Sequence, residues 1–297
     1  MNPIQCLSIS EIKTHTGASF ANLDLYYQHF GLPLDEAPVV LINHSLTGDS
    51  DVAGHKGWWK ELVGPDKTID TNRYAILAFN IPGNGIEGQT LPNPEDFHTG
   101  DLYALVGGSI GGGIAWEMAV LAPKLTKYLI PIAADWKAND WILANTFLQK
   151  RILENSSNPL EDARIHAMLT YRTPKSFDHR FGRTRNEELG IFNIESWLLH
   201  HGRKLAERFH LDSYVLVNHL LASINIERDG KTASELISKI EAEIHLIAVD
   251  SDLFFTPEED QQTFAMIKPN KDSIFYHELK SIHGHDAFLI ENDAMEQ

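Results

Sequence analysis

The stretch LYALVGGSIGGGIAWEMAVLA, residues 102–122, decides the fold of this chain. It opens with five apolar residues, passes through a glycine-rich turn, and continues with helix-forming residues that stop before Pro123. The turn reads G-x-S-x-G, in which Ser109 stands between a strand and a helix. Such a sharp turn crowds the positions two before and two after the serine, and glycine at both positions relieves the crowding. The stretch therefore predicts a strand at 102–106, a projecting Ser109 hydroxyl and a helix at 113–121.

Strand-like and helix-like segments alternate on both sides of this turn. We expect further strands at 37–43, 73–80, 127–134, 244–249 and 274–279, a short helix at 58–63, and a helix that begins near Thr256. Thr256 and Glu259 fit a capping box, and Pro257 suits the first helical position. Strands that alternate with helices indicate a mostly parallel sheet covered by helices on both faces. The fold class is therefore α/β.

Residues 138–235 follow a different pattern. Helix-period segments at 141–153, 160–169, 194–209 and 213–224 succeed one another with no clear strand between them. We expect one α/β core domain, formed by residues 1–137 and 236–297, with residues 138–235 inserted as a helical cap. Twelve of the 25 lysines and arginines lie between residues 137 and 208. Most suit a solvated helical surface, and a few are candidates for contact with a polyanionic cosubstrate.

The connection from the strand at 73–80 to the strand at 102–106 is unusual. Parallel neighbours need a crossover of a dozen or more residues, usually a helix, but residues 81–101 contain three prolines and no apolar periodicity. Either the crossover is irregular, or residues of the native protein are missing from this sequence. Its segment GNGIEG, residues 83–88, matches G-x-G-x-x-G, yet the following QTLPNP cannot open the helix that would bind a pyrophosphate. We therefore reject a dinucleotide site.

Composition narrows the classes of partner. The 297 residues carry a formal net charge of −16, which disfavours nucleic acid and anionic lipid as partners. Cys6 is the only cysteine, so no intramolecular disulfide can form. The first residues lack the features of a signal peptide, and no apolar run reaches the roughly 18–20 residues of a membrane span. We expect a cytoplasmic protein that binds neither nucleic acid nor membranes.

A serine nucleophile needs a base, and the base needs a group that orients it. Asp250 and Asp252 follow the strand at 244–249; Asp250 suits a bond to the loop backbone, and Asp252 lies where an orienting carboxylate belongs. His283 and His285 follow the last strand, and His285, between a glycine and an acid, is the better base. The order Ser, Asp, His is that of α/β-hydrolases. These residues therefore predict a catalytic triad of serine, aspartate and histidine.

Two backbone N–H groups are candidates for an oxyanion hole. One belongs to Ile110, directly after the serine, and the other to Leu46 in the loop HSLTG that follows the strand at 37–43. Each such donor typically contributes about 2.7–4 kcal/mol in the transition state. A metal site is the rival interpretation of His283 and His285, but no third ligand motif accompanies them, so no metal is expected.

Several blocks of the chain occur together in one known family. They are LINHSLTGDSDVAG, LVGGSIGGGIAWEMA, MLTYRTPKSFDHRFGR, NIESWLLHHGRKLAERF, SDLFF and GHDAFLIE. On these blocks the chain resembles the homoserine O-acetyltransferases, a branch of the α/β-hydrolases, over nearly its whole length. The family pattern places the triad at Ser109, Asp252 and His285, the same residues that the strand order predicts.

The resemblance implies a ping-pong acyltransferase of methionine biosynthesis that binds no cofactor. Acetyl-CoA, as cosubstrate, would acetylate Ser109 with His285 as base, while the N–H groups of Leu46 and Ile110 stabilise the oxyanion. Homoserine would then accept the acetyl group on its side-chain hydroxyl. Asp286 matches the family aspartate that helps hold the amino-acid substrate. The resemblance also implies a homodimer formed through the cap.

The chain departs from the family pattern in several places. Gln149 occupies the position aligned with the family arginine for the homoserine carboxylate, and the neighbouring Lys150 and Arg151 would face elsewhere on a helix. ENSSNPLEDAR replaces the usual glycine- and tyrosine-containing stretch, the crossover is shorter by about a helix, and the chain ends soon after FLIE. Alternative functions are an esterase-like serine hydrolase, a transferase for another acyl group such as succinyl or another acceptor such as serine, and a non-enzymatic binding module.

Overall fold

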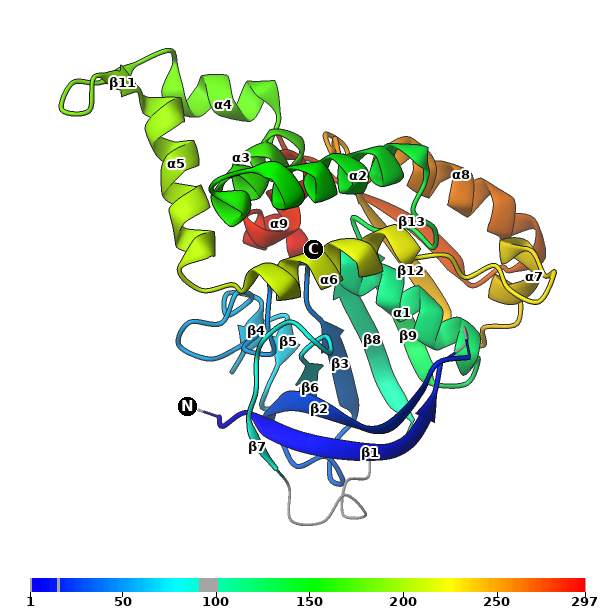
Figure 1. Cartoon of the computed structure of the whole chain (residues 1–297). Coiled ribbons are helices and arrows are strands. Elements are labelled where there is room, and N and C mark those ends of the chain that lie inside the picture. The colour runs from blue at the N-terminus through cyan, green and yellow to red at the C-terminus, as the bar shows by residue number, and fades with distance from the viewer. Residues whose placement is uncertain (1, 15–16, 91–100, 297) are drawn as a thin grey trace.

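The computed structural model describes residues 2–14, 17–90 and 101–296. Within this part of the chain, nine strands form one sheet in the order β13-β12-β9-β8-β3-β6-β2-β1-β7 (Figure 1). The strands from β13 to β6 are all parallel: β13 (Ile274–Leu279), β12 (Glu243–Val249), β9 (Thr126–Ile132), β8 (Leu102–Gly108), β3 (Val39–Asn43) and β6 (Ala75–Phe79). Every strand predicted from the sequence is present, and the mostly parallel sheet is confirmed.

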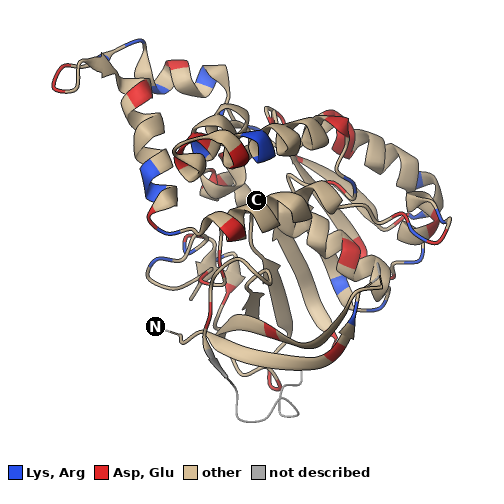
Figure 2. Ribbon diagram, viewed as in Figure 1, with Lys and Arg blue, Asp and Glu red and all other residues tan. Residues whose placement is uncertain are grey.

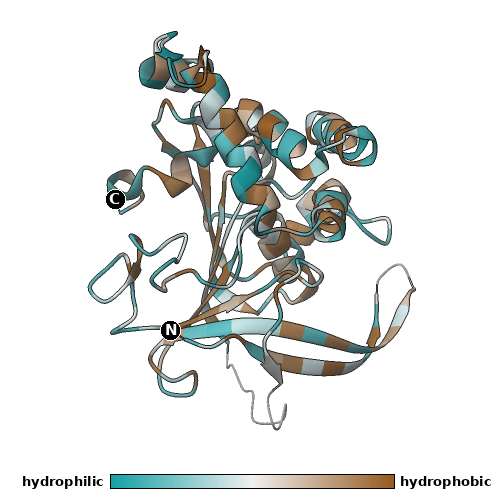
Figure 3. Ribbon diagram, turned by 60° about the vertical axis from the view of Figure 1, so that its left-hand side comes forward, coloured by the Kyte–Doolittle hydropathy of each residue, from teal (hydrophilic) through white to brown (hydrophobic). Residues whose placement is uncertain are grey.

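The chain begins with two long strands that sequence analysis did not predict. β1 (Gln5–Lys13) and β2 (Ser19–Gly31) pair antiparallel, and β2 joins the parallel strands through an antiparallel pairing with β6. The short β7 (Gln89–Thr90) extends the sheet beyond β1. Figure 3 shows hydrophobic and hydrophilic residues mixed along the β1–β2 ribbon. Cys6 lies buried within β1.

The two faces of the sheet are covered by different kinds of structure. Helices α1 (Ile110–Leu121) and α8 (Pro257–Ile267) pack on one face, where Trp116 is fully buried. The other face is covered by turns around Trp59 and by the C-terminal segment that carries Phe288. The Trp59 indole N–H donates a hydrogen bond of 3.0 Å to the Phe288 carbonyl, which joins these two coverings.

The helix predicted at 58–63 is wrong. The segment forms hydrogen-bonded turns and ends in the strand β4 (Val63–Gly64), which pairs with β5 (Ile69–Asp70). Trp59 and Leu62 are both buried under the sheet. The packing of these two side chains against the sheet favours turns over a helix in this segment.

Helices α2–α6 form a layer, and α2, α3, α5 and α6 contribute to an apolar cluster that also contains Leu46, Ile110 and Phe254. They are α2 (Asp140–Asn155), α3 (Pro159–Tyr171), α4 (Pro174–Phe181), α5 (Asn193–Ala206) and α6 (Leu211–Ser223). Four of them match the predicted helical segments, whereas α4 and the small hairpin of β10 (Arg185–Asn186) and β11 (Ile191–Phe192) were not predicted. In Figure 1, α4, α5 and the hairpin project from the side of the molecule.

The crossover from β6 to β8 is irregular as far as the structure describes it. Residues 81–90 contain turns, with Gly83 and Gly85 at positive φ, and end in β7; no helix is present there. Residues 91–100, the rest of the predicted irregular stretch, lie outside the described residues.

Two short helices and two 3-10 helices, the first of them at Lys268–Asn270 directly after α8, complete the described chain. α7 (Ala233–Ile237) precedes β12, and a 3-10 helix (Gly284–Leu289) and α9 (Asn292–Met295) follow β13. At the start of α8, Pro257 occupies the first turn as predicted, but the Thr256 side chain makes no capping bond, so the predicted capping box is absent. None of the described helices combines the length and apolar character that crossing a bilayer requires.

Candidate active site

Ser109 occupies the turn between β8 and α1 in a strained conformation. Its backbone has φ 58° and ψ −128°, which residues with a Cβ rarely adopt. The Ser109 N–H donates to the Ile132 carbonyl at 2.9 Å, and the Ser109 carbonyl accepts from the N–H groups of Gly112 and Gly113. Such strain costs about 1–3 kcal/mol and persists only where the surroundings enforce it. Here the β9 strand on one side and α1 on the other hold the turn.

Close backbone contacts explain the glycines on either side of this serine. A Cβ atom at Gly107 would lie 2.2 Å from the carbonyl oxygen of Gly111, and one at Gly111 would lie 2.4 Å from the carbonyl oxygen of Asn43. Both contacts are with backbone atoms that cannot move aside. The crowding that the sequence pattern predicts at these two positions is therefore present in the structure.

His285 bridges Ser109 and Asp252. Its Nε2 atom lies 2.9 Å from Ser109 Oγ, and its Nδ1 atom lies 2.7 Å from Asp252 Oδ2. Since an ionised carboxylate can only accept, it fixes the proton of a neutral imidazole on Nδ1 and leaves Nε2 free to accept the serine proton. The other carboxylate oxygen, Asp252 Oδ1, accepts the N–H groups of Phe254 and Phe255 at 2.7 and 3.0 Å. The carboxylate is thus held on both sides.

Aromatic rings enclose the imidazole of this bridge. The ring centroids of Tyr171, Phe254, Phe255 and Phe288 lie 5.4, 5.3, 5.7 and 5.7 Å from it, respectively. The side chains of the serine, the aspartate and the histidine are all at least 95% buried. An enclosed apolar surrounding strengthens each hydrogen bond within it, because little water competes for the same groups.

Asp250 and His283, the alternatives to Asp252 and His285, make other contacts. Asp250 accepts the N–H of Ser281 at 2.9 Å, which is the loop contact expected for it. His283 bonds to Ser176 Oγ at 2.9 Å and to the Arg172 guanidinium at 3.1 Å. No cluster of three or more potential metal ligands occurs in the described ranges of the chain.

The two candidate oxyanion donors lie in one apolar cluster. Ile110 is the first residue of α1, so its N–H has no acceptor within the helix. Leu46 lies in the loop after β3, and its N–H donates to no atom of the described residues. Both side chains pack into the core shared with α2–α6. The oxyanion hole formed by Leu46 and Ile110 stays a prediction.

A neutral histidine anchors the loop that carries Leu46. His44 is fully buried, and burial lowers the pKa of its imidazole to about 4. Its Nδ1–H donates to the Ser45 carbonyl at 2.7 Å, and its Nε2 accepts the N–H of Ile81 at 3.0 Å. Only the neutral imidazole with its proton on Nδ1 can make both bonds. The ring therefore connects the β3 loop to the loop after β6.

Asn84, in the GNGIEG segment, supports the same anchor. Its amide lies 3.4 Å from His44 Nε2 and donates to Asn80 Oδ1 at 3.3 Å. Asn80 in turn accepts the N–H of Ser50, which lies a few residues beyond the Leu46 loop. The glycine-rich segment that resembled a dinucleotide motif thus has a structural role next to the site.

Charged groups gather on the side of His285 that faces α3. Asp286 forms an ion pair with Arg172, with 3.1 Å between Oδ2 and Nε, although the N–H is not aligned as a hydrogen bond. Burial raises the pKa of the Asp286 carboxyl, and the charges of Arg164 and Arg172 oppose that rise. Arg164 lies over the Tyr171 ring, 5.6 Å from its centroid. A carboxylate and two guanidinium groups therefore surround the space beside the imidazole.

Arg164 is the cation of this site that sequence analysis did not select. It lies seven residues before Tyr171 on α3, so two helical turns place both on one face. A helical projection of the sequence would have shown that Arg164 and Tyr171 share a face, but not that this face turns toward His285.

Comparison with known proteins places this geometry in a family. The homoserine O-acetyltransferase of Nostoc punctiforme is 32% identical to this chain over 306 residues, which cover 87% of this chain and 83% of that protein. That of Chlorobium chlorochromatii is 29% identical, with coverage of 96% and 90%. The chain belongs to the homoserine O-acetyltransferase family. No family model matches the chain.

Superposition on solved structures shows that this chain has the α/β-hydrolase fold. The homoserine O-acetyltransferase from Bacillus anthracis superposes with a TM-score of 0.84 at 18% identity, and covers 100% of this chain and 96% of that one. Esterase E22 reaches a TM-score of 0.85 at 18% identity, with coverage of 100% and 98%. The acetylester hydrolase from Corynebacterium glutamicum reaches 0.83 at 18%, with coverage of 99% and 93%. Transferases and esterases thus share this architecture.

Gln149, which departs from the homoserine O-acetyltransferase family pattern, lies between α2 and α3. Its Nε2 donates to the Ala163 carbonyl at 3.0 Å and lies 2.9 Å from His166 Nδ1. Its Oε1 is buried without a partner among the described residues. Both partners belong to α3, and neither is Ser109 or Asp286. A substrate contact by Gln149 stays a prediction. Lys150 and Arg151 are exposed and pair with Glu154, as expected for residues that face elsewhere.

Two further acids, Asp135 and Asp260, are buried in the structure. Burial raises the pKa of Asp135 to about 7, although its Oδ1 accepts bonds from the Trp136 N–H and the Thr263 hydroxyl. Burial and the neighbouring carboxylates also raise the pKa of Asp260. A raised pKa favours the neutral form of each acid, and a neutral Asp260 adds no negative charge near Asp252.

We expect replacement of the histidine anchor to weaken transition-state stabilisation. His44→Leu leaves the Ile81 N–H without its acceptor and frees the Leu46 loop, so kcat for a simple acetyl ester should fall about 10- to 100-fold with little change in KM. His55→Leu, at an exposed histidine, serves as control. Steady-state kinetics on protein shown to be folded by circular dichroism would check this. An unchanged kcat in folded His44→Leu protein would contradict it.

We expect Asp135→Asn to stabilise the protein at alkaline pH. The folded state holds the Asp135 proton up to about pH 7, whereas the unfolded chain releases it near the ordinary value of 3.8, so stability is lost as pH rises between these values. The amide keeps the acceptor oxygen but does not titrate. The free energy of unfolding should exceed that of the wild type by on the order of a few kcal/mol at about pH 8 and by much less at about pH 4.5. Urea denaturation at both pH values, with exposed Asp35→Asn as control, measures this; an equal difference at both would refute it.

Proposed function

We propose that this chain transfers an acetyl group from acetyl-CoA to the side-chain hydroxyl of homoserine, a step of methionine biosynthesis in the cytoplasm. The observation that carries the proposal is the position of His285, in hydrogen-bond reach of both Ser109 and Asp252 inside an aromatic enclosure. These three residues are the proposed catalytic triad. Membership of the homoserine O-acetyltransferase family supports the choice of substrates.

In the first half-reaction Ser109 Oγ attacks the thioester carbonyl carbon of acetyl-CoA. Its proton passes to His285 Nε2, and Asp252 stabilises the imidazolium that results. The N–H groups of Leu46 and Ile110 bind the oxyanion of the tetrahedral intermediate. The carbon–sulfur bond then breaks, the sulfur takes the proton from His285, and CoA leaves an acetyl ester on Ser109.

In the second half-reaction the homoserine hydroxyl attacks this ester. His285 accepts the hydroxyl proton and returns it to Ser109 Oγ as O-acetylhomoserine departs. Asp286 would bind the substrate ammonium group. Arg164, which lies beside Tyr171 on the face of α3 next to the triad, would bind the substrate carboxylate in place of the arginine that Gln149 replaces.

We also propose that residues 138–235 act as a cap on a core of residues 1–137 and 236–297. Helices within this segment share one apolar core with Leu46 and Ile110, and the triad side chains beneath are nearly fully buried. An acyl-enzyme shielded from bulk water survives until the amino-acid acceptor binds. This shielding favours transfer over hydrolysis.

An esterase-like hydrolase on the same triad is the second candidate function. The close structural likeness to esterase E22 and to the acetylester hydrolase from Corynebacterium glutamicum supports it, as does the glutamine at position 149. In that case water would replace homoserine in the second half-reaction.

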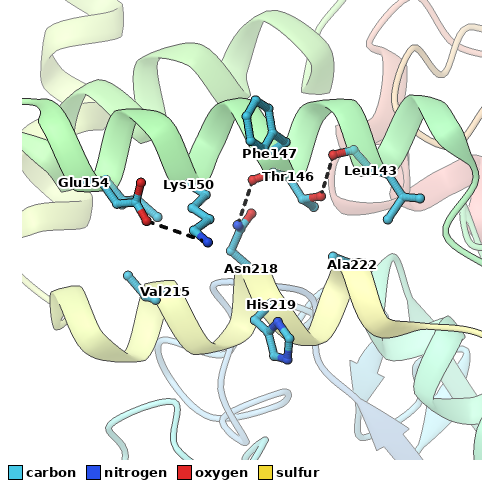
Figure 4. Close-up of a pocket in the computed structure, with 10 residues that line it drawn as sticks. Leu143, Thr146, Phe147, Lys150, Glu154, Val215, Asn218, His219 and Ala222 are labelled. Atoms are coloured by element: carbon cyan, nitrogen blue, oxygen red, sulfur yellow. Dashed lines mark hydrogen bonds and ion pairs between the residues drawn. The ribbon is translucent and has the colours of Figure 1, made fainter.

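We further propose that the chain forms a homodimer through the cap. A cavity of about 380 Å³ lies between α2 and α6, and Figure 4 shows Leu143 and Val215 turned into it from the two helices. Phe147, on α2 at its edge, is 65% exposed. Large apolar side chains gathered at a surface groove are typical of a protein interface. A second copy of the cap is the proposed occupant.

Transfer is tested with purified protein, acetyl-CoA and homoserine. CoA thiol release and formation of O-acetylhomoserine, followed by absorbance and mass spectrometry, should fall about 10⁴-fold or more in Ser109→Ala, because the nucleophile is lost. Arg164→Gln should raise KM for homoserine about 10- to 100-fold, as expected for loss of a charged hydrogen bond, and leave hydrolysis of 4-nitrophenyl acetate little changed. Exposed Arg151→Gln is the matched control.

Different outcomes separate the candidate functions. Ester hydrolysis that homoserine does not reduce, with no acetylated amino acid formed, would favour the hydrolase. The same assay with succinyl-CoA and with serine tests the alternative donor and acceptor. Absence of both activities, and of organophosphate labelling at Ser109, would leave the binding module.

The dimer is tested by light scattering coupled to size-exclusion chromatography. The wild type should elute as a dimer, and Phe147→Glu should shift it to the monomer because the charge would have to be buried in the apolar groove. Leu121→Glu is the control, since Leu121 is 68% exposed on α1, outside α2 and α6. A wild-type monomer, or the same shift in both variants, would argue against this interface.

A further inference from the structure

A second cavity, lined by cations, lies between α4 and α5. It has a volume of about 450 Å³, and the side chains that characterise it are Arg180, Thr184, Ser196, Trp197, His200 and Arg203. No carboxylate is among its lining residues. The cavity thus combines two guanidinium groups, an imidazole and two hydroxyls with an aromatic wall, which is the chemistry that recognises a phosphorylated ligand.

The two arginines that line this cavity carry charges that no carboxylate in the described part of the chain neutralises. Neither Arg180 nor Arg203 forms an ion pair within the described ranges; Arg180 instead lies over the rings of Phe181 and Trp197. Figure 2 shows basic segments on both α4 and α5. Two arginines without anionic partners therefore face one open space.

Side-chain contacts connect this cavity to the proposed triad. Asp286, next to His285, pairs with Arg172, and the Arg172 guanidinium lies 5.9 Å from the centre of the Trp197 ring. The Arg180 guanidinium lies 5.7 Å from the same ring. Trp197 is therefore in contact with one arginine that belongs to the substrate side and another that lines the cavity. A long ligand bound at both ends would pass over this ring.

We propose that the cavity between α4 and α5 binds the phosphate groups of the 3′-phosphoadenosine diphosphate portion of acyl-CoA. The inference rests on the proposed function, because it takes acyl-CoA as the donor. Arg180 and Arg203 contact the phosphate oxygens through their planar guanidinium forks, and Trp197 and Phe181 provide an apolar wall for the adenosine. The pantetheine arm then extends past Arg172 and carries the thioester to Ser109.

Direct binding tests the cavity without any turnover. Isothermal titration of the full chain with CoA, with adenosine 3′,5′-bisphosphate and with pantetheine is compared between the wild type and the double variant Arg180→Gln, Arg203→Gln. The Kd of CoA and of the bisphosphate should rise about 10-fold or more, as expected for lost charged hydrogen bonds, and the Kd of pantetheine should not change. Arg73→Gln, at an exposed arginine just before the start of β6 and outside the cavity lining, is the control. Equal effects on CoA and pantetheine, no effect on CoA, or pyrophosphate binding as tight as that of the bisphosphate would overturn the assignment.

Kinetics separates failure of the cavity from failure of the proposed function. The ratio of kcat/KM for acetyl-CoA to that for acetyl-pantetheine should fall about 10-fold in the double variant and stay constant in Arg73→Gln. A protein that transfers acetyl groups with an unchanged ratio would retain the proposed function and lose the cavity assignment. A protein that binds the bisphosphate through Arg180 and Arg203 but transfers no acetyl group would retain the cavity and lose the proposed function.

Discussion

The hydrogen bonds of His285 to Ser109 and Asp252 are the interactions on which the rest of the site depends. The three residues follow three different strands, β8, β12 and β13, whose carboxyl ends share one edge of the sheet because the strands are parallel. The sheet alone does not fix the distances. The strained backbone of Ser109 projects its hydroxyl, and two backbone N–H groups fix the Asp252 carboxylate. The imidazole then has one position that satisfies both neighbours.

The parts of this arrangement that sequence analysis predicted are encoded locally. The glycines around Ser109 avoid clashes with nearby backbone atoms. The buried strands are continuous apolar runs, which can be recognised without knowing the strands they pair with. The choice of Asp252 over Asp250 followed from distance beyond the strand end, and the structure brings Asp252 to His285 and Asp250 to the Ser281 backbone. Each of these inferences used only the order of elements and the chemistry of one turn.

The parts that were not predicted depend on long-range packing. β1 and β2 have partly exposed faces and a mixed pattern, so their pairing with each other and with β6 gives no strong periodic signal. The turns at Trp59 are determined by contact with Phe288, more than 200 residues away in sequence. Arg164 reaches the site by the angle of α3, while Gln149, chosen from the aligned sequence, turns into the contact with α3. A helix face can be read from sequence, but its rotation against a neighbour cannot.

Burial around the site also selects the protonation state of groups that do not react. His44 stays neutral because a charged imidazole would be fully desolvated and would lose the bond from the Ile81 N–H. Burial likewise raises the pKa of Asp135, and burial together with neighbouring carboxylates, Asp252 among them, raises that of Asp260. The Asp252 carboxylate accepts two backbone N–H groups, and the other charged side chains near His285 lie on the α3 side. The low-dielectric interior thereby confines charge to the surfaces that substrates approach.

The position of these charged groups matters for the proposed reaction, in which one small site serves two substrates in turn. In a ping-pong reaction, CoA must leave the space beside Ser109 before homoserine occupies it, so affinity located at the thioester itself would obstruct the second step. In the proposed binding mode, binding energy obtained at a distance, through phosphates held between α4 and α5, would position the first substrate without occupying the charges beside His285. Asp286 and Arg164 then remain available for an amino acid. The separation of the two cationic regions by Trp197 is the structural feature that permits this division.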